Sequence, residues 1–244
     1  MRDVVSILGI NVDRVTMEEA VQRAWEMTSS GGVVYTPNPE IIMNAYRNAD
    51  YAAVLNRADM VVPDGIGVVI ASKMLKKPVP ERVAGFDLVC SILRRAGQED
   101  KSVYIFGGKE GVAAKAAENM TRNFGVKIAG TEHGYHKDTT PVVNDICEKK
   151  PDILLVCLGA PYQEKWMDAK RSSLPECLII GAGGSVDVLS GNTKRAPEFF
   201  IKLGLEWLYR LITQPSRFIR MLDLPKFAIT VFFKGKRQGG EKNA

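Results

Sequence analysis

Short apolar runs alternate along this chain with longer segments in which apolar positions recur every three or four residues. Short, wholly apolar runs separated by amphipathic helices are typical of parallel strands covered on both faces. The pattern therefore predicts an α/β fold, a Rossmann-like and mostly parallel sheet with helices on both faces. The predicted strands are residues 4–7, 33–35, 60–62, 103–106, 126–129, 153–158 and 178–180.

The periodicity changes after residue 195. Residues 199–212 are predicted to form one helix, which Pro215 ends, and residues 217–222 a short second helix. Pro225 is expected to break the helical pattern again before an apolar run at 227–233. We therefore expect an α/β catalytic core at residues 1–195 and a basic, aromatic-rich helical appendage at residues 196–244.

Charge and aromatic residues are concentrated in that appendage. Residues 194–244 hold six Lys and five Arg against four acidic residues, a net +7, whereas the whole chain carries +5. The same segment contains eight of the nineteen aromatic residues. Its longest apolar run is far shorter than the about 20 residues that span a bilayer, so we expect it to lie on an anionic membrane surface. The alternative is that its apolar positions pack on the core or at a dimer contact.

The spacing of the cysteines and the N-terminal segment indicate where in the cell the protein is expected. The four cysteines show no C-x-x-C spacing, which favours buried thiols in a reducing cytosol. The N-terminal segment lacks the apolar core and cleavage site of a signal peptide. The expected location is therefore cytoplasmic, peripheral on the inner face of the cell membrane. We expect no nucleic-acid partner, whereas an exposed apolar tail makes a homo-oligomer possible.

One carboxylate stands at a strand exit. The predicted strand 60–62 stops at Pro63, and Asp64 and Gly65 precede a helix that opens at Gly67. In open α/β sheets, ligands bind at the carboxyl ends of the strands. Asp64 is therefore a candidate catalytic residue. The alternative is that Asp64 only caps the following helix.

Three other predicted strand exits are rich in glycine. Glycine lets backbone N–H groups approach phosphate oxygens closely, so these exits favour a nucleotide or another phosphate ligand over simple turns. The sequence has no G-x-x-x-x-G-K-[ST] motif, which excludes a P-loop NTPase. A nucleotide-dependent oxidoreductase and a non-catalytic membrane-associated binding module stay open as alternatives. The glycine exits are Gly107-Gly108, Gly159 and residues 181–184.

Metal and cofactor signals are weak. The sequence has no D-x-D pair and no H-E-x-x-H motif. His133 and His136 are predicted to be surface or rim residues rather than ligands. Arg, Lys and helix N-termini are then expected to stabilise a leaving phosphate, with no metal and no other cofactor.

Motifs along nearly the whole chain resemble those of the WecG/TagA/CpsF glycosyltransferases, and most closely the teichoic-acid members. One departure is Val186, where an aromatic residue is expected. The similar segments, in order, are TPNPE at 36–40, PDGIG at 63–67, PERVAG at 80–85, GAPYQE at 159–164, residues 181–187 with Gly191, RAP at 195–197, and LGLEWLYR at 203–210 followed by Pro215, Arg217 and Arg220.

The resemblance implies an enzyme that moves N-acetylmannosamine from UDP-N-acetylmannosamine to undecaprenyl-diphospho-N-acetylglucosamine, with inversion and without a metal. Other UDP-sugar donors, such as N-acetylmannosaminuronate or glucuronate, are an alternative. An inverting transfer needs one carboxylate to remove the acceptor proton and cationic help for the leaving diphosphate.

The resemblance also assigns residues. It implies that Asp64 is the general base, that Thr36 lies beside it, and that Arg82 and Gln163 line the same pocket. It further implies that the appendage closes over the site and brings arginines near the diphosphate. Arg82 pairing with Glu81 or Asp87, Gln163 as a helix cap and Thr36 as a turn residue are the structural alternatives. The appendage arginines are Arg210, Arg217 and Arg220, and the expected substrate-binding residues are Asn38, Gly107, Gly108, Gly159, Gln163, Gly183 and Asp187.

Overall fold

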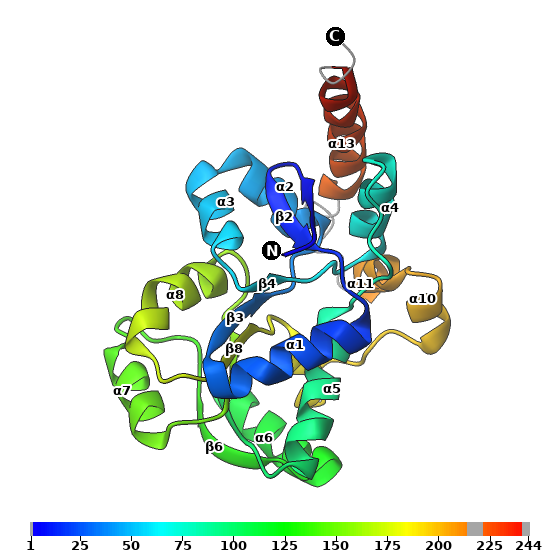
Figure 1. The fold of residues 1–244 in the computed structure, drawn as a ribbon. Helices are drawn as coiled ribbons and strands as arrows, with labels where there is room; N and C mark the ends of the chain where they lie inside the picture. The colour runs from blue at the N-terminus through cyan, green and yellow to red at the C-terminus, as the bar shows by residue number, and fades with distance from the viewer. Residues whose placement is uncertain (1, 214–221, 241–244) are drawn as a thin grey trace.

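A computed structural model describes residues 2–213 and 222–240 of the chain. Six strands form one sheet in the order β4-β3-β8-β7-β5-β6, and every neighbouring pair is parallel (Figure 1). The predicted α/β fold with a parallel sheet is therefore confirmed. The strands are β3 (Gly32–Tyr35), β4 (Met60–Val61), β5 (Ser102–Gly107), β6 (Lys127–Glu132), β7 (Ile153–Cys157) and β8 (Leu178–Gly181).

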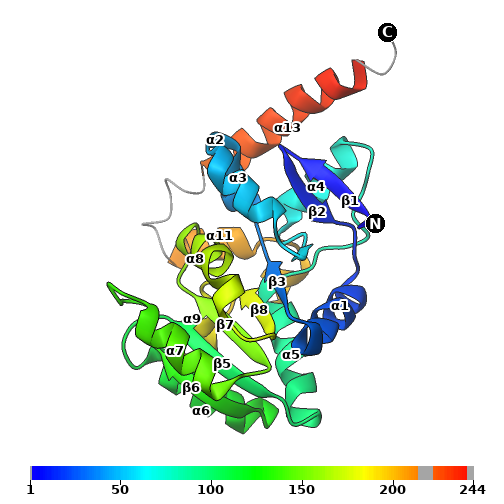
Figure 2. The ribbon, with the colours of Figure 1, turned by 60° about the vertical axis from the view of Figure 1, so that its left-hand side comes forward.

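Helices cover both faces of the sheet (Figure 2). Successive side chains of a strand point to opposite faces, so each apolar run supplies two cores. Tyr35 and Phe106 are buried in the core on one face, while Val34 and Ile105 are buried in the other. The helices are α1 (Met17–Ser30), α2 (Pro39–Arg47), α3 (Ala49–Asn56), α4 (Ile66–Met74), α5 (Gly85–Gln98), α6 (Val112–Phe124), α7 (Thr140–Lys149), α8 (Tyr162–Lys170), α9 (Ser185–Leu189), α10 (Glu198–Lys202), α11 (Glu206–Thr213) and α13 (Asp223–Gly240).

The residue pattern explains where the helices next to the site begin. Thr16 and Glu19 form a capping box at the start of α1, each side chain accepting from the other residue's backbone N–H. The side chain of Asn38 caps α2 by accepting from the backbone N–H of Ile41 at 3.0 Å, and Pro39 occupies the first turn. The Asn38 cap fixes the direction in which the chain leaves β3.

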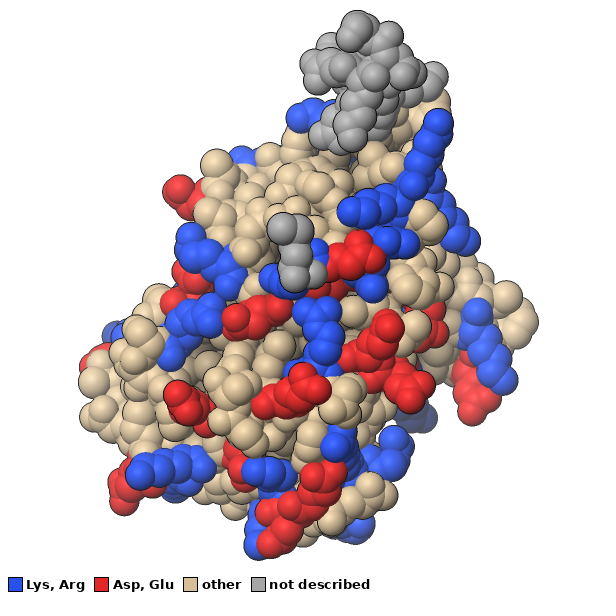
Figure 3. Space-filling model, in the orientation of Figure 1, with Lys and Arg blue, Asp and Glu red and all other residues tan. Residues whose placement is uncertain are grey.

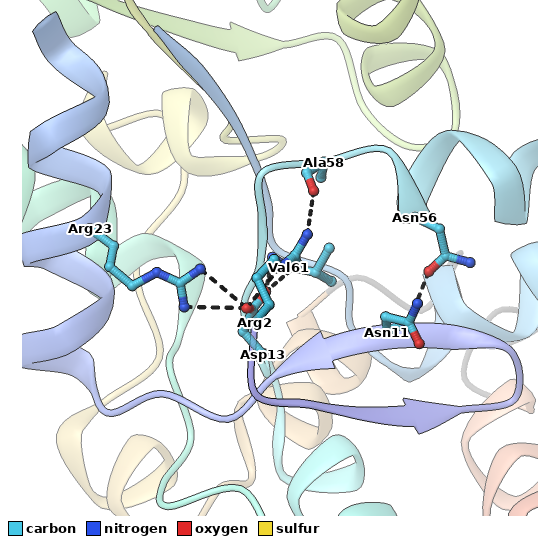
Figure 4. A network of polar contacts seen from close by, with 7 residues as sticks. All are labelled: Arg2, Asn11, Asp13, Arg23, Asn56, Ala58 and Val61. Carbon is cyan, nitrogen blue, oxygen red and sulfur yellow. Dashed lines mark hydrogen bonds and ion pairs between the residues drawn. The ribbon is translucent and has the colours of Figure 1, made fainter. Parts of the chain in front are cut away.

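The first predicted strand does not join the main sheet. β1 (Val4–Ile7) pairs with an unpredicted strand, β2 (Ile10–Asp13), in a separate antiparallel hairpin. Asp13 at the end of this hairpin is fully buried and forms ion pairs with Arg2 and Arg23 (Figure 4). It also accepts a hydrogen bond from the backbone N–H of Val61 at 2.8 Å. The hairpin is therefore attached to β4, three residues before Asp64.

The appendage differs from the prediction in two respects. The single helix expected at 199–212 is wrong, because the chain turns at Gly204 with φ +70° and forms α10 and α11 instead. Pro225 does not break a helix but lies in the first turn of α13, where its missing N–H costs no hydrogen bond. Pro215 and almost all of the predicted helix at 217–222 lie outside the described residues. The division at residue 195 stays a prediction.

One face of α13 packs on the body of the molecule. Phe227 and Val231 are buried in the core that α2 and α4 also line. Ile229 and Phe233 on the same helix are more than half exposed. Beyond these contacts, α13 extends away from the rest of the structure (Figure 2). The sequence left open whether the apolar positions of the appendage pack on the core instead of facing a membrane. In α13 they pack on the core along one side of the helix only.

The Asp13 contacts lead to a stability prediction. Replacing Asp13 with Ala leaves two arginines and the Val61 N–H without their buried acceptor, so we expect a loss of about 3–5 kcal/mol in the free energy of unfolding. Urea denaturation followed by circular dichroism measures this loss. The exposed Asp3 pairs with Arg14 at 2.7 Å and is the matched control, for which Asp3→Ala should cost about 0–1 kcal/mol. Equal losses in the two variants would contradict the buried role of Asp13.

Candidate active site

Several strand exits meet at one edge of the sheet because the strands are parallel. The backbone N–H of Val62, after β4, donates to the carbonyl of Tyr35 at 3.0 Å, which keeps the β3 and β4 exits together. The Thr36 hydroxyl, after β3, donates to the carbonyl of Gly181 at the end of β8, at 3.3 Å. Residues that are more than 140 positions apart in the sequence are thus in contact at this edge.

The loop that carries Asp64 is constrained on both sides. Val83 donates its backbone N–H to the carbonyl of Pro63 at 3.1 Å, and Gly65 has φ +86°. A Cβ added at Gly67 would lie 2.6 Å from Cγ of Pro39, so only glycine permits this approach. The N-cap residue of α4 is Gly65 rather than Asp64. The alternative that Asp64 only caps the helix stays open.

A polar cavity of about 420 Å³ lies beside this loop. Its walls come from the exits of β3, β4, β7 and β8, from the start of α5 and from the segment before α10. The expected residues that line it are Thr36, Asn38, Asp64, Gly159, Gln163, Gly183 and Asp187.

An apolar cavity of about 430 Å³ lies on the other side of Asp64. Ile66, Ile70 and Met74 of α4 form one wall, while Trp207 of α11 and Phe227 of α13 contribute to another. The two cavities share a small set of lining residues. These are Asn38, Glu40, Asp64 and Glu206. The carboxylate singled out from the sequence therefore lies where the cavities meet.

Thr36 lies between two elements that come close together. A Cβ added at Gly85, the first residue of α5, would lie 2.9 Å from the Thr36 hydroxyl oxygen. Glycine at this position lets α5 start against Thr36. The place of Thr36 beside Asp64 stays a prediction. Arg82, three residues before the first residue of this helix, lines the apolar cavity and pairs with Glu206 of α11 at 2.9 Å. Its partner is thus neither Glu81 nor Asp87, the two alternatives from the sequence.

Gln163 connects α8 to the glycine-rich exit of β8. Its side-chain carbonyl accepts from the backbone N–H of Gly183 at 3.0 Å, and its amide donates to the Glu164 carboxyl at 2.7 Å. A Cβ at Gly181 would lie 3.0 Å from the Gln163 amide nitrogen. Gln163 therefore holds the Gly181–Gly184 turn in shape while it lines the cavity.

Glu164 is the buried end of this chain of contacts. The residue is 2% exposed, and the Tyr51 hydroxyl donates to its other carboxyl oxygen at 2.9 Å. Burial raises the pKa of the Glu164 carboxyl above its ordinary value, and the hydrogen bonds from Gln163 and Tyr51 oppose part of that rise.

Some predicted site residues lie elsewhere. Gly107 and Gly108 line neither cavity, although both have positive φ. Their backbone closely approaches other loops, because the Gly108 N–H donates to the carbonyl of Cys157 and the Gly108 carbonyl accepts from Gly134. The backbone of Arg210 is in α11, but its side chain is not described, and Arg217 and Arg220 lie outside the described residues. The predicted roles of these arginines stay predictions.

Several lining residues were not predicted as site residues. Arg195 donates to Asp87 at 2.7 Å, and its guanidinium lies over the Phe86 ring at 4.7 Å. Its buried Nε has no hydrogen-bond partner within the described part of the chain. Arg195 belongs to the RAP segment noted in the sequence, where it served only as a domain boundary. Lys194, Glu40 and Glu206 also line the polar cavity, and isolated charged residues give little sequence signal.

Two further features concern metals and membranes. Among the described residues, one group of three side chains has the spacing of a metal site, namely Glu132, His133 and His136, and it lies outside both cavities. Within residues 2–213 and 222–240, no helix has the length and apolar character needed to span a membrane.

Comparison with known proteins identifies the class. The chain belongs to the WecG/TagA/CpsF family of glycosyl transferases, whose family model matches residues 5–241. The resemblance seen in the motifs is thereby confirmed, and the protein is an enzyme of the hexosyltransferase kind. The oxidoreductase and the non-catalytic binding module are set aside by this membership.

Similar proteins within the family have been named individually. The chain is 45% identical over 210 residues to a protein of Bacillus spizizenii, covering 86% of this chain and 81% of the relative. It is 41% identical to a Bacillus subtilis protein, with 85% and 82% covered, and 32% identical to a Staphylococcus aureus protein, with 96% and 94% covered. All three are named N-acetylglucosaminyldiphosphoundecaprenol N-acetyl-beta-D-mannosaminyltransferase.

The buried Glu164 leads to a pH prediction. A carboxyl whose pKa is raised on folding binds more protons in the folded state, so its contribution to stability falls as pH rises from its ordinary value of 4.5 through the folded-state pKa. Glu164→Gln removes this titration. The free energy of unfolding of the wild type minus that of the variant should therefore decrease with pH, by at most about 1.4 kcal/mol per pH unit.

Urea denaturation at a series of pH values measures this difference. Glu118→Gln, on the exposed face of α6, corrects for the general effect of removing one carboxylate. A difference for Glu164→Gln that increases with pH would contradict the direction assigned to this group.

Proposed function

We propose that this protein is an inverting, metal-independent glycosyltransferase that moves N-acetylmannosamine from UDP-N-acetylmannosamine to undecaprenyl-diphospho-N-acetylglucosamine in wall teichoic acid linkage-unit synthesis. The names of its relatives support the reaction, and their acceptor is a lipid-linked sugar. The observation that carries the proposal is the position of Asp64, where a polar and an apolar cavity meet. The reaction needs a carboxylate between a polar donor and a lipid acceptor.

The polar cavity suits the sugar nucleotide. The glycines at the exits of β7 and β8 leave backbone groups accessible, and Lys194 and Arg195 add positive charge to the wall. The buried, unpartnered Nε of Arg195 is a donor that a phosphate oxygen could satisfy. Asp187 lines the same cavity, and its carboxylate suits sugar or ribose hydroxyls better than phosphates.

The chemistry follows from one carboxylate at the junction. Asp64 takes the proton of the acceptor hydroxyl as that oxygen bonds to the anomeric carbon of the donor. The bond from this carbon to the diphosphate oxygen breaks on the opposite side, which inverts the configuration. The leaving UDP keeps the bonding electrons and is stabilised by cationic side chains and backbone N–H groups. Thr36 is placed to orient the reacting sugar, and Arg210, Arg217 and Arg220 remain candidates for the diphosphate.

The apolar cavity suits the first isoprene units of the acceptor. Its walls from α4, α11 and α13 present aliphatic and aromatic side chains, and Asp64 is among its lining residues. An acceptor bound this way has its lipid on one side of Asp64 and its sugar on the other. The hydrophobic effect then supplies binding energy away from the reacting atoms.

The outer end of this cavity supports a place on an anionic membrane surface. Lys73, Lys226 and Lys234 on α4 and α13 are exposed beside exposed apolar residues such as Phe233. Basic side chains gather over this part of the molecule (Figure 3). We propose a peripheral position on the inner face of the cell membrane, with homo-oligomers possible through the same apolar surface. Sedimentation of the whole chain with anionic but not zwitterionic vesicles would test the membrane part.

The donor sugar is the least constrained part of the proposal. Other UDP-sugars, such as N-acetylmannosaminuronate or glucuronate, would use the same chemistry for other surface polysaccharides. A screen of these donors with a short-chain diphospho-N-acetylglucosamine acceptor, reading UDP release, distinguishes them.

Asp64→Asn tests the catalytic role. The amide keeps the shape of the carboxylate but cannot accept the acceptor proton, so turnover should fall by about 10²–10⁴-fold while donor affinity changes little. Steady-state transfer assays and donor titration measure the two quantities. Asp3→Asn, at an exposed position just before β1, is the matched control and should leave turnover unchanged. A folded Asp64→Asn enzyme with full turnover would refute the assignment.

Ile70→Asn tests the apolar cavity. Ile70 lines this cavity and is 49% exposed, so the change should not disturb folding strongly. It should raise KM several-fold for an acceptor with a long isoprenoid chain and leave KM for a short-chain soluble acceptor nearly unchanged. Equal effects on the two acceptors would indicate that the isoprenoid binds elsewhere.

A further inference from the structure

Three potential metal ligands come together at the edge of the sheet. Glu132 is the last residue of β6, and His133 and His136 follow in the next loop. One ligand atom from each residue lies within 4.8 Å of the other two. His136 Nε2 is 3.0 Å from a Glu132 carboxyl oxygen, and the two imidazole rings stack with centroids 4.1 Å apart. These are the only two histidines in the chain.

The loop that carries the histidines is held in place by the core. Gly134 donates its backbone N–H to the carbonyl of Gly108 at 2.9 Å. A Cβ at Gly134 would lie 2.8 Å from Cδ2 of Leu158, so the loop packs closely on the residue that follows β7. The His136 ring lies 6.3 Å from the ring of buried Phe106. The side chains are thus brought together by a loop anchored on β5 and β7, which reduces the entropy cost of binding an ion.

We infer that Glu132, His133 and His136 form a binding site for a transition-metal ion of the Zn²⁺ type. Two imidazoles and one carboxylate are a donor set that suits Zn²⁺, whereas Mg²⁺ and Ca²⁺ prefer oxygen ligands. With bonds of about 2.0–2.1 Å, tetrahedral ligand atoms lie about 3.3 Å apart, close to the His136–Glu132 separation. Water completes the coordination from the solvent side, since all three residues are partly exposed.

Loading requires one local rearrangement. His133 Nδ1 accepts the backbone N–H of Tyr135 at 3.1 Å, so ligation through this nitrogen replaces that hydrogen bond. The stacked rings must also rotate for both lone pairs to face one ion. The ion then ties the end of β6 to the loop packed on Gly107-Gly108. It lies outside both cavities and has no part in the transfer reaction.

Zinc titration of the full-length chain without an affinity tag tests the site. Isothermal calorimetry should give one equivalent of bound Zn²⁺, and His133→Ala, His136→Phe and Glu132→Gln should each weaken binding by at least about 10–100-fold. The nitrogen resonances of both imidazoles should shift on loading. Circular dichroism checks that each variant is folded, and Glu132→Gln is the variant that changes shape least.

The matched control tests whether cysteine thiols, which are also potential zinc ligands, account for the binding. Cys90 and Cys147 are the partly exposed cysteines, and their double replacement by Ser should leave zinc affinity unchanged. Loss of binding in this control, unchanged binding in the histidine variants, or no binding by the wild type would each overturn the inference. The readout is binding rather than turnover, so its failure leaves the proposed glycosyl transfer untouched.

Discussion

The parallel direction of all six strands is the constraint on which the site depends. Since the carboxyl ends of parallel strands lie on the same edge, the exits of β3, β4, β7 and β8 are brought together whatever their separation in the sequence. Close approaches at this edge require glycine at two places. Gly67 lets α4 start against Pro39, and Gly85 lets α5 start against Thr36. The loop that carries Asp64 is thereby held between two helix N-termini.

The sequence predicted the main sheet well because all of its strands except the edge strand β6 are mostly buried. A continuous apolar run, such as the one in β7, can be recognised as a strand even when the order of the strands in the sheet is unknown. The strand β2 and the helix α3 were not predicted. Residues 10–13 are a very short run, although Gly9 separates them from β1, and only Asn48 separates α3 from α2. The single helix expected at 199–212 failed for a local reason, namely the left-handed turn at Gly204.

The candidate site was predictable where a residue type and a strand exit coincide. Asp64 lies two residues after a predicted strand, so its place at the sheet edge could be inferred, whereas Thr36 was expected in the site only because of the family resemblance. Glu206 and Arg195 could not be found this way, because their place in the site depends on how the segment after β8 returns across the sheet edge. Gln163 was expected as a lining residue, but its link between Gly183 and Glu164 is a tertiary contact that no spacing encodes.

The ion pair between Arg82 and Glu206 connects the core to the appendage at the point where the cavities meet. Both side chains are about one-fifth exposed, so their charges are only partly screened by water. Arg82 can approach a leaving diphosphate only if it exchanges Glu206 for phosphate oxygens, which offer it more negative charge and a bidentate geometry. Release of Glu206 would in turn free α11, which carries Arg210, to move. Under the proposed function, we therefore expect binding of the diphosphate and the position of α11 to be coupled through the Glu206 carboxylate.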